Sequence, residues 1–193
     1  MKTKIYFILF FVATFFSSCQ KKDCTQGTTT YNISSDDKSK IPYNGKDTLT
    51  FVRTIIGDTF TFYGTGWQSG TGISYTAEDC PQKQVFEIRQ LIFQSPNFSN
   101  PISISIYVQN VTKSTFIDIG FQNTVFENTD VVLSPLYDLD STIIQGKKYY
   151  GIMFLNDLDS ATPTTYNCCF NIQFGILKLF FANGETWELI SKK

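Results

Sequence analysis

The chain has 193 residues, with 16 Lys or Arg and 17 Asp or Glu, so its net charge is −1 at pH 7. It contains no histidine, which excludes Ser-His-Asp and Cys-His nucleophile systems and histidine-ligated zinc. A near-neutral chain without basic clusters is also a poor match for nucleic acid. Aromatic residues make up 16% of the chain, and most of them must be buried because their burial gain is large.

The first nineteen residues, MKTKIYFILFFVATFFSSC, have the layout of an export signal. Lys2 and Lys4 precede an apolar run over residues 5–16. These twelve residues would rise about 18 Å as a helix, less than the roughly 30 Å hydrocarbon core of a bilayer. The run therefore predicts a secretory signal peptide over residues 1–18 rather than a membrane-spanning helix. Its removal leaves 193 − 18 = 175 residues with a charge of −1 − 2 = −3, enough for one domain with a core.

Ser17, Ser18 and Cys19 follow the apolar run and resemble the lipobox of bacterial lipoprotein signal peptides. The resemblance implies cleavage before Cys19, a diacylglycerol thioether on its sulfur, and acylation of the new amine with a fatty acid such as palmitate. Several acyl chains hold a protein to a membrane almost permanently, at about 0.8 kcal/mol per buried CH₂. The alternative is an ordinary secretory signal with a spare thiol at Cys19, but Phe16 at position −3 is a poor match to an A-x-A site.

The Phe- and Ser-rich signal is similar to those of Bacteroidota lipoproteins, and Lys22-Asp23 resembles their surface-export signal. The likeness implies a lipid anchor in the outer membrane, on its periplasmic face or at the cell surface. Residues 140–190, with GKKYY, GILKL and NGETWEL, resemble the C-terminal parts of small lipoproteins of the same group. This resemblance implies one all-β domain that ends in a hairpin, and it brings no known activity.

The stretch between the signal and the domain is polar. Residues 20–46 show no apolar periodicity, which predicts a flexible tether over residues 19–46. The turn cluster IPYNG at residues 41–45 marks the approach to a domain over residues 47–193.

Short strands dominate the remainder of the chain. Residues 48–54 and 59–63 flank a Gly-Asp pair and predict a hairpin, and Asn183-Gly184 predicts another. Residues 102–108 alternate apolar and polar side chains and form the clearest half-buried strand. Because no segment keeps helical periodicity over a helix's length, we expect an all-β fold, either a single antiparallel β-sandwich or a partly open barrel.

Residues 64–72, GTGWQSGTG, have the composition of a flexible glycine-rich loop. The helix and the Lys that a phosphate-binding loop needs do not follow it. Trp67, with Tyr63 and Tyr75 nearby, is a candidate ligand contact that would stack on a sugar or a partner surface. The alternative is that Trp67 caps the edge of the core.

Four further cysteines follow Cys19. Cys168 and Cys169 are neighbours in an extended stretch, so their side chains point to opposite faces. Either each of them pairs with Cys24 or Cys80, or Cys24 and Cys80 pair and leave two buried thiols; we favour the Cys24–Cys80 disulfide. The C-x₂-C knuckles of a four-cysteine metal site are missing, so neither a metal nor another cofactor is expected.

Two pairs of carboxylates are the acid–base candidates, Asp138 with Asp140 and Asp157 with Asp159. Their spacing alone does not make them face each other as glycosidase chemistry requires. We interpret them as solvated loop acids and assign no catalytic residue.

Thr48, Ser141 and Ser160 each follow an Asp and precede an aliphatic residue or Thr. This pattern resembles the O-glycosylation sites of exported Bacteroidota proteins. We expect Ser160 to be modified first, because its loop has the most exposed composition.

The sequence thus favours a non-catalytic, membrane-anchored binding or interaction module, whose partner is a protein, a glycan or a small apolar ligand. The alternative is a carboxylate-dependent glycan hydrolase. The absence of histidine and of any nucleophile motif favours the binding module.

Overall fold

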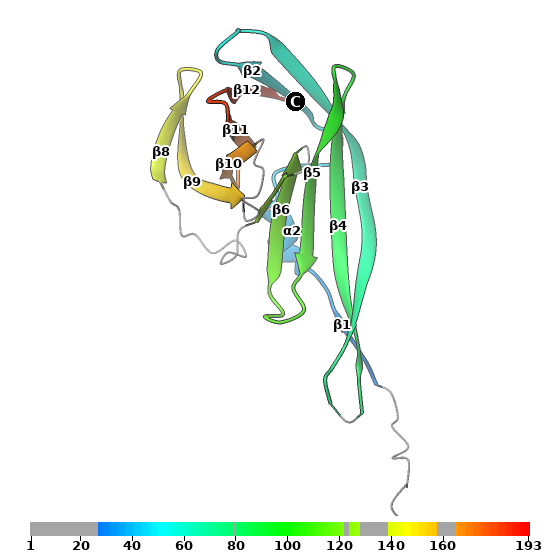
Figure 1. Ribbon diagram of the computed structural model, residues 1–193. Coiled ribbons are helices and arrows are strands. Elements are labelled where there is room, and N and C mark those ends of the chain that lie inside the picture. Colours follow the sequence, from blue (N-terminus) through cyan, green and yellow to red (C-terminus); the bar gives the residue numbers. More distant parts are fainter. Residues whose placement is uncertain (1–26, 79, 122–123, 128–138, 158–164) are drawn as a thin grey trace, which may run out of the picture.

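The computed structural model describes residues 27–78, 80–121, 124–127, 139–157 and 165–193. A curled antiparallel sheet forms a half-barrel (Figure 1), which confirms the predicted all-β class. The elements are β1 (Thr28–Tyr31), α2 (Ser35–Ser39), β2 (Thr48–Arg53), β3 (Thr59–Tyr75), β4 (Lys83–Ser95), β5 (Phe98–Val108), β6 (Thr115–Phe121), β7 (Thr124–Glu127), β8 (Leu139–Ile144), β9 (Lys147–Asp157), β10 (Thr165–Asn171), β11 (Gly175–Phe181) and β12 (Thr186–Lys192).

The strands follow the order β1-β4-β3-β2-β12-β11-β10-β9-β7-β6-β5, and β8 pairs with β9. β5, the last strand of this order, also pairs with β4, the second strand. The expected hairpins β2–β3 and β11–β12 are both present. β12 also pairs with β2, and beyond this ladder Thr48 and Lys193 exchange two backbone hydrogen bonds of 2.8 and 3.0 Å. Strands from the two ends of the domain therefore lie side by side.

Alternating apolar side chains of the strands fill the inside of the curl. Ile102, Ile104 and Ile106 of β5 are at most 1% exposed, as the predicted alternation requires. The Trp187 ring lies at the centre of an aromatic cluster, with centroid distances of 4.9–6.2 Å to five Phe rings. These rings belong to Phe60, Phe62, Phe98, Phe121 and Phe181.

The predicted tether is wrong for residues 28–46, which belong to the fold. β1 pairs in parallel with β4, and Ile33, Ile41 and Tyr43 are buried, with 3–7% exposure. These apolar residues are too widely spaced to give a periodic signal. They are nevertheless buried against the sheet, so the folded domain begins well before residue 47.

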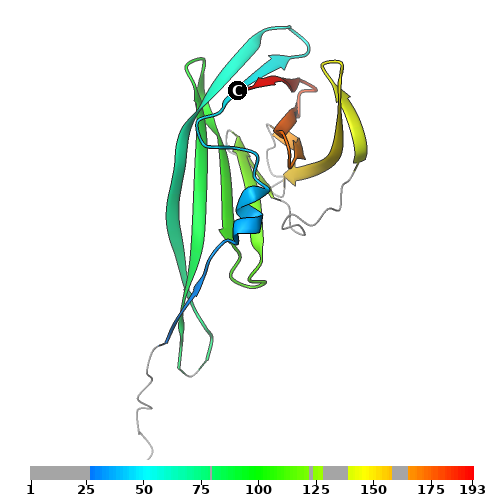
Figure 2. The same ribbon diagram turned by 180° about the vertical axis from the view of Figure 1, so that it is seen from behind.

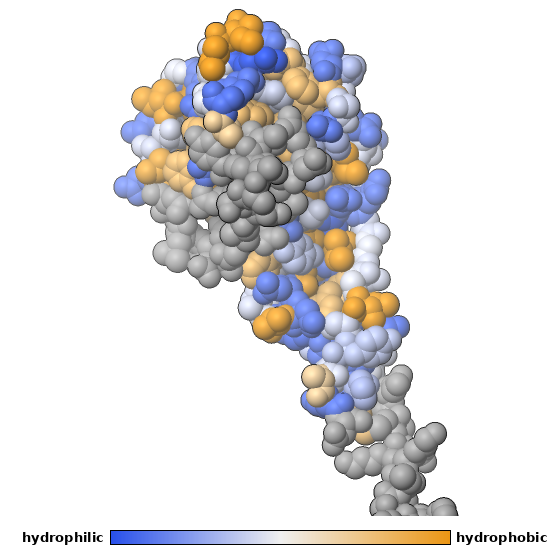
Figure 3. Space-filling view, viewed as in Figure 1, coloured by the Kyte–Doolittle hydropathy of each residue, from blue (hydrophilic) through white to orange (hydrophobic). Residues whose placement is uncertain are grey.

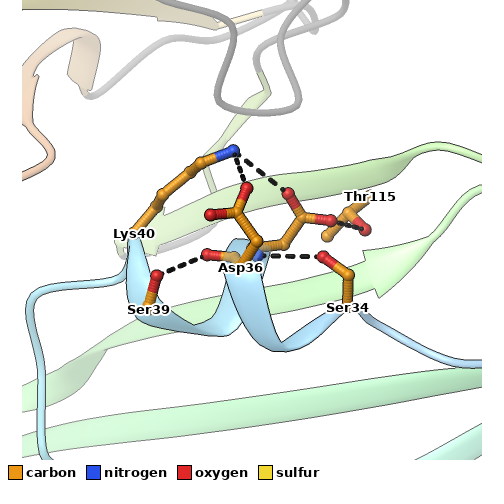
Figure 4. Close-up of polar contacts among 6 residues, drawn as sticks. Ser34, Asp36, Ser39, Lys40 and Thr115 are labelled. Atoms are coloured by element: carbon orange, nitrogen blue, oxygen red, sulfur yellow. Dashed lines mark hydrogen bonds and ion pairs between the residues drawn. The ribbon is translucent and has the colours of Figure 1, made fainter.

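The single turn of α2 fixes this N-terminal segment to the sheet (Figure 4). Ser34 caps the helix by accepting a hydrogen bond from Asp37 N at 3.0 Å. Lys40 Nζ lies 2.7 Å from Asp36 Oδ2, and Thr115 of β6 donates to Asp37 Oδ2 at 2.8 Å. The contact between Asp37 and Thr115 joins parts of the chain that are 78 residues apart.

The glycine-rich stretch over residues 64–72 is strand rather than the expected loop. It lies within β3, and from Trp67 onward it pairs with β4 in unbroken register. The glycines accommodate a bulge between Gly64 and Trp67, where Gly66 has φ +97°. The far end of the β3–β4 hairpin extends past the other strands, at the end of the molecule where the chain enters β1 (Figures 1 and 2).

Candidate functional site

The three aromatic residues expected to form one ligand contact do not lie together. Tyr63 and Tyr75 stand near opposite ends of β3, separated by twelve residues and hence by about 40 Å. Trp67 is partly buried against the core, and its Nε1 donates to Tyr43 O at 3.1 Å. The Arg89 guanidinium lies 4.9 Å from the Trp67 ring centroid. Trp67 therefore caps the edge of the core, and its role as a ligand contact stays a prediction.

Tyr63 lies at an open hollow on the surface, with a volume of about 440 Å³. The hollow is lined by Tyr63, Gly64, Thr65, Gln94, Ser95 and Pro96. Phe62 faces the core and is fully buried, so its neighbour Tyr63 turns outward and is 52% exposed. The hollow therefore presents one aromatic ring next to polar side chains.

The sheet register places polar groups on both sides of the Tyr63 ring. Thr48 of β2 and Gln94 of β4 are its direct cross-strand partners, and side chains in such positions share one face. Gln94 and Thr65 are exposed, and Thr65 Oγ1 donates to Ile92 O at 3.0 Å. An amide and hydroxyls around an exposed ring are the groups that bind a hydroxyl-rich ligand.

Gly64 brings two backbone segments together beside the hollow. Its N–H donates to Asp47 O at 2.9 Å, and a Cβ at this position would lie 2.6 Å from Gly45 O. The Asp47 carboxylate accepts hydrogen bonds from Asn44 N at 2.7 Å and from Gly45 N at 3.1 Å. The buried Asp47 therefore has a structural role in the turn that supports this edge of the hollow.

The cysteines agree in part with the favoured pairing. Cys80 is disulfide-bonded, whereas Cys168 and Cys169 are buried thiols, at 0% and 3% exposure. The alternative in which each of these two pairs with Cys24 or Cys80 is therefore wrong. Cys24 lies outside the described residues, so its bond to Cys80 stays a prediction.

The predicted O-glycosylation sites lie in different surroundings. Thr48 lies in β2, where it is half-buried and paired with Tyr63. Ser141 lies in β8, opposite Tyr150 of β9, and is also half-buried. Ser160 and Cys19, the predicted lipidation site, lie outside the described residues.

The carboxylate pairs fall partly outside the described residues, which include neither Asp138 nor Asp159 nor the side chain of Asp157. Asp140 is exposed at the start of β8. The glycan hydrolase therefore stays an untested alternative. Within the described ranges, no three His, Cys, Asp or Glu side chains are grouped as metal ligands would be.

Comparison with known proteins identifies no relative: no protein-family model, no curated protein and no solved structure matches this chain significantly. Across the ranges that the structure describes, no helix combines the length and the apolar character needed to cross a bilayer.

Proposed function

We propose that this chain is an exported, lipid-anchored binding protein that contacts a glycan through the hollow at Tyr63. The proposed anchor is a diacylglycerol thioether at Cys19, which the lipobox-like order of Ser17, Ser18 and Cys19 supports. The proposed location is the outer membrane, on its periplasmic face or at the cell surface.

The observation that carries the binding site is the position of the Tyr63 ring. It is half-exposed beside the hollow and lies between Thr48 and Gln94. The apolar face of a sugar ring stacks on a phenol ring, while the hydroxyls of the sugar exchange hydrogen bonds with amide and hydroxyl side chains. A shallow site with one stacking ring predicts weak binding, with a Kd of about 1 mM, or about −4 kcal/mol.

Titration of the purified protein with oligosaccharides, followed by NMR saturation transfer, tests the site. Replacing Tyr63 by Ala removes the stacking ring and should weaken binding about fivefold, whereas Tyr63→Phe should keep most of the affinity. Tyr150→Ala is the matched control, because Tyr150 is exposed to 65% on a distant strand. Equal affinities of the Tyr63→Ala and Tyr150→Ala variants would exclude this site.

Labelling with radioactive palmitate tests the anchor. We expect the label in the wild-type protein, which should enter the detergent phase, and no label in the Cys19→Ala variant. Protease treatment of intact cells then distinguishes the two faces of the membrane, because only a surface-exposed protein is cut.

A further inference from the structure

The structure shows at which end of the molecule a lipid anchor would lie. Lys83 N, at the start of β4, donates to Gly27 O at 3.1 Å. From there β1 runs along β4, with Thr28 opposite Lys83 and Thr30 opposite Val85. The chain that precedes residue 27 therefore leaves the fold beside the tip of the β3–β4 hairpin.

Two exposed apolar side chains lie on one face of this hairpin end. Ile73 and Tyr75 are 57% and 60% exposed, and their cross-strand partners are Val85 and Lys83. Together with the two β1 threonines opposite these partners, the six positions include no acidic residue. We call these six residues the stem face, and Figure 3 shows apolar side chains on the surface of the narrow stem.

The other face of the hairpin end is occupied by the turn between β5 and β6. Ser74, which points away from the stem face, donates to Asn110 Oδ1 at 3.0 Å. Lys113 Nζ donates to Gln84 Oε1 at 2.8 Å and lies 4.7 Å from the Phe86 ring centroid. The turn between β5 and β6 therefore packs against one side of the hairpin end, and the stem face lies on the opposite side.

We propose that the stem face lies on the lipid surface that carries the anchor at Cys19; this inference rests on the proposed anchor. Gly27 lies eight positions after Cys19, so the lipidated sulfur lies within about 28 Å of Gly27, beside the hairpin tip. A Tyr and aliphatic residues beside a Lys are typical of side chains at a membrane interface, where the Lys stem lies on apolar surface and its ammonium stays in water.

A second pair of exposed apolar residues is too far away to reach the same surface. Ile55 and Ile56, in the turn between β2 and β3, are 68% and 65% exposed. They lie beyond the opposite end of β3 from Tyr75, and the seventeen residues of β3 span about 56 Å. The segment 20–26, QKKDCTQ, is polar and offers no apolar cover for the stem face. The lipid surface is therefore the occupant that the position of the stem face favours.

The test uses the full chain, expressed in a bacterium that processes lipoproteins, purified from its membranes and reconstituted into phosphatidylethanolamine and phosphatidylglycerol vesicles. Tyr75→Trp places a fluorophore in the stem face, and Ile56→Trp is the matched control at the far end. Doxyl groups near the lipid headgroup quench tryptophan fluorescence at the membrane surface. We therefore expect these lipids to quench most of the emission that Tyr75→Trp adds to the wild-type signal. The emission that Ile56→Trp adds should be unchanged.

Three outcomes would overturn the inference in different ways. If the protein is acylated but the Tyr75→Trp emission is quenched no more than the Ile56→Trp emission, the stem face does not contact lipid, although the proposed anchor holds. If the N-terminal peptide carries no acyl groups and the protein stays in the buffer phase, the proposed anchor is wrong, and the lipid contact that rests on it is excluded as well. Tyr75→Trp emission that the doxyl lipid quenches only after the protein is diluted in the vesicles would replace the lipid surface by a second copy of the chain, because a second copy on the stem face would shield the ring from the lipid.

Discussion

The Tyr43 hydroxyl accepts a hydrogen bond of 2.7 Å from the backbone N–H of Ile176, a residue 133 positions further along the chain. Burial raises the pKa of Tyr43 far above its ordinary value, so the hydroxyl stays protonated and neutral. The ring packs edge-on against Phe93 at 5.2 Å between centroids. This contact fixes the segment before β2 to the start of β11.

Because Gly175 has no side chain, the Tyr43 hydroxyl can occupy the space beside it. A Cβ at Gly175 would lie 1.9 Å from that oxygen, and the residue has φ +90°. We therefore expect Gly175→Ala to lower the free energy of unfolding by about 3 kcal/mol or more. Tyr43→Phe, which leaves the buried N–H of Ile176 without its acceptor, should cost about 1–3 kcal/mol. Urea unfolding measures both, and a Gly175→Ala variant as stable as wild type would contradict this packing.

Two glycines of β3 should respond differently to the same substitution. A Cβ at Gly64 would lie 2.6 Å from Gly45 O, whereas at Gly70 no atom lies within 4 Å. Gly64→Ala should therefore cost about 1–3 kcal/mol through overpacking, and Gly70→Ala should be neutral or stabilising by up to about 1 kcal/mol. Thermal unfolding compares them directly; the reverse order would argue against the contact of β3 with the turn at Gly45.

Glu188 should make the stability depend on pH in the acid range. Burial alone would raise the pKa of its carboxyl, but hydrogen bonds of 2.6 Å from Lys178 and Gln145 outweigh burial and hold the pKa below its usual 4.5. Because the folded-state pKa is the lower one, this stabilisation is complete above the unfolded-state pKa and is lost as the pH falls through the folded-state pKa.

Wild type should therefore lose more stability than Glu188→Gln between about pH 5 and pH 3. Urea unfolding at a series of pH values measures the difference. Parallel curves for the two proteins would show that Glu188 has no such role.

The buried cysteines should be unreactive in the folded protein. Burial, and to a smaller degree the neighbouring Cys169, raises the pKa of the Cys168 thiol well above its ordinary value, and the thiolate is the reactive form. Iodoacetamide should therefore modify Cys168 and Cys169 only after denaturation, and Cys80 only after reduction. Peptide mass mapping checks both and should recover Cys24 linked to Cys80; alkylation of Cys168 under native conditions would contradict its burial.

The hairpins could be predicted from the sequence because local turn chemistry determines them. Gly184, at the turn between β11 and β12, has φ +81°, a conformation that glycine adopts without strain. The switch in apolar parity between Phe86 and Leu91 is typical of a bulge, yet β4 pairs with β3 in unbroken register there. Phe86 faces the opposite side and is covered by Tyr31, whose ring stacks on it at 5.1 Å. The change of parity therefore reflects cover by Tyr31 of β1, a segment distant in sequence, rather than a bulge in β4.

The candidate site likewise depends on contacts between residues that are far apart in the sequence. The local sequence singles out Tyr63 and Trp67 alike, because both are aromatic residues in or next to a glycine-rich stretch. The bulge at Gly66 and the hydrogen bond from Trp67 to Tyr43 O separate their roles. Gln94, which completes the hollow, gives no signal in the sequence, because it lies beside Tyr63 only through the pairing of β3 with β4.

The two backbone hydrogen bonds between Thr48 and Lys193 have a consequence for biogenesis. β2 is synthesised early, but one of its neighbours in the sheet is β12, which is synthesised more than a hundred residues later. Closing so long a loop is slow and has to wait until β12 has been synthesised. A nascent chain that has not yet emerged completely therefore stays open, and an open chain is the form that a narrow protein-conducting pore admits.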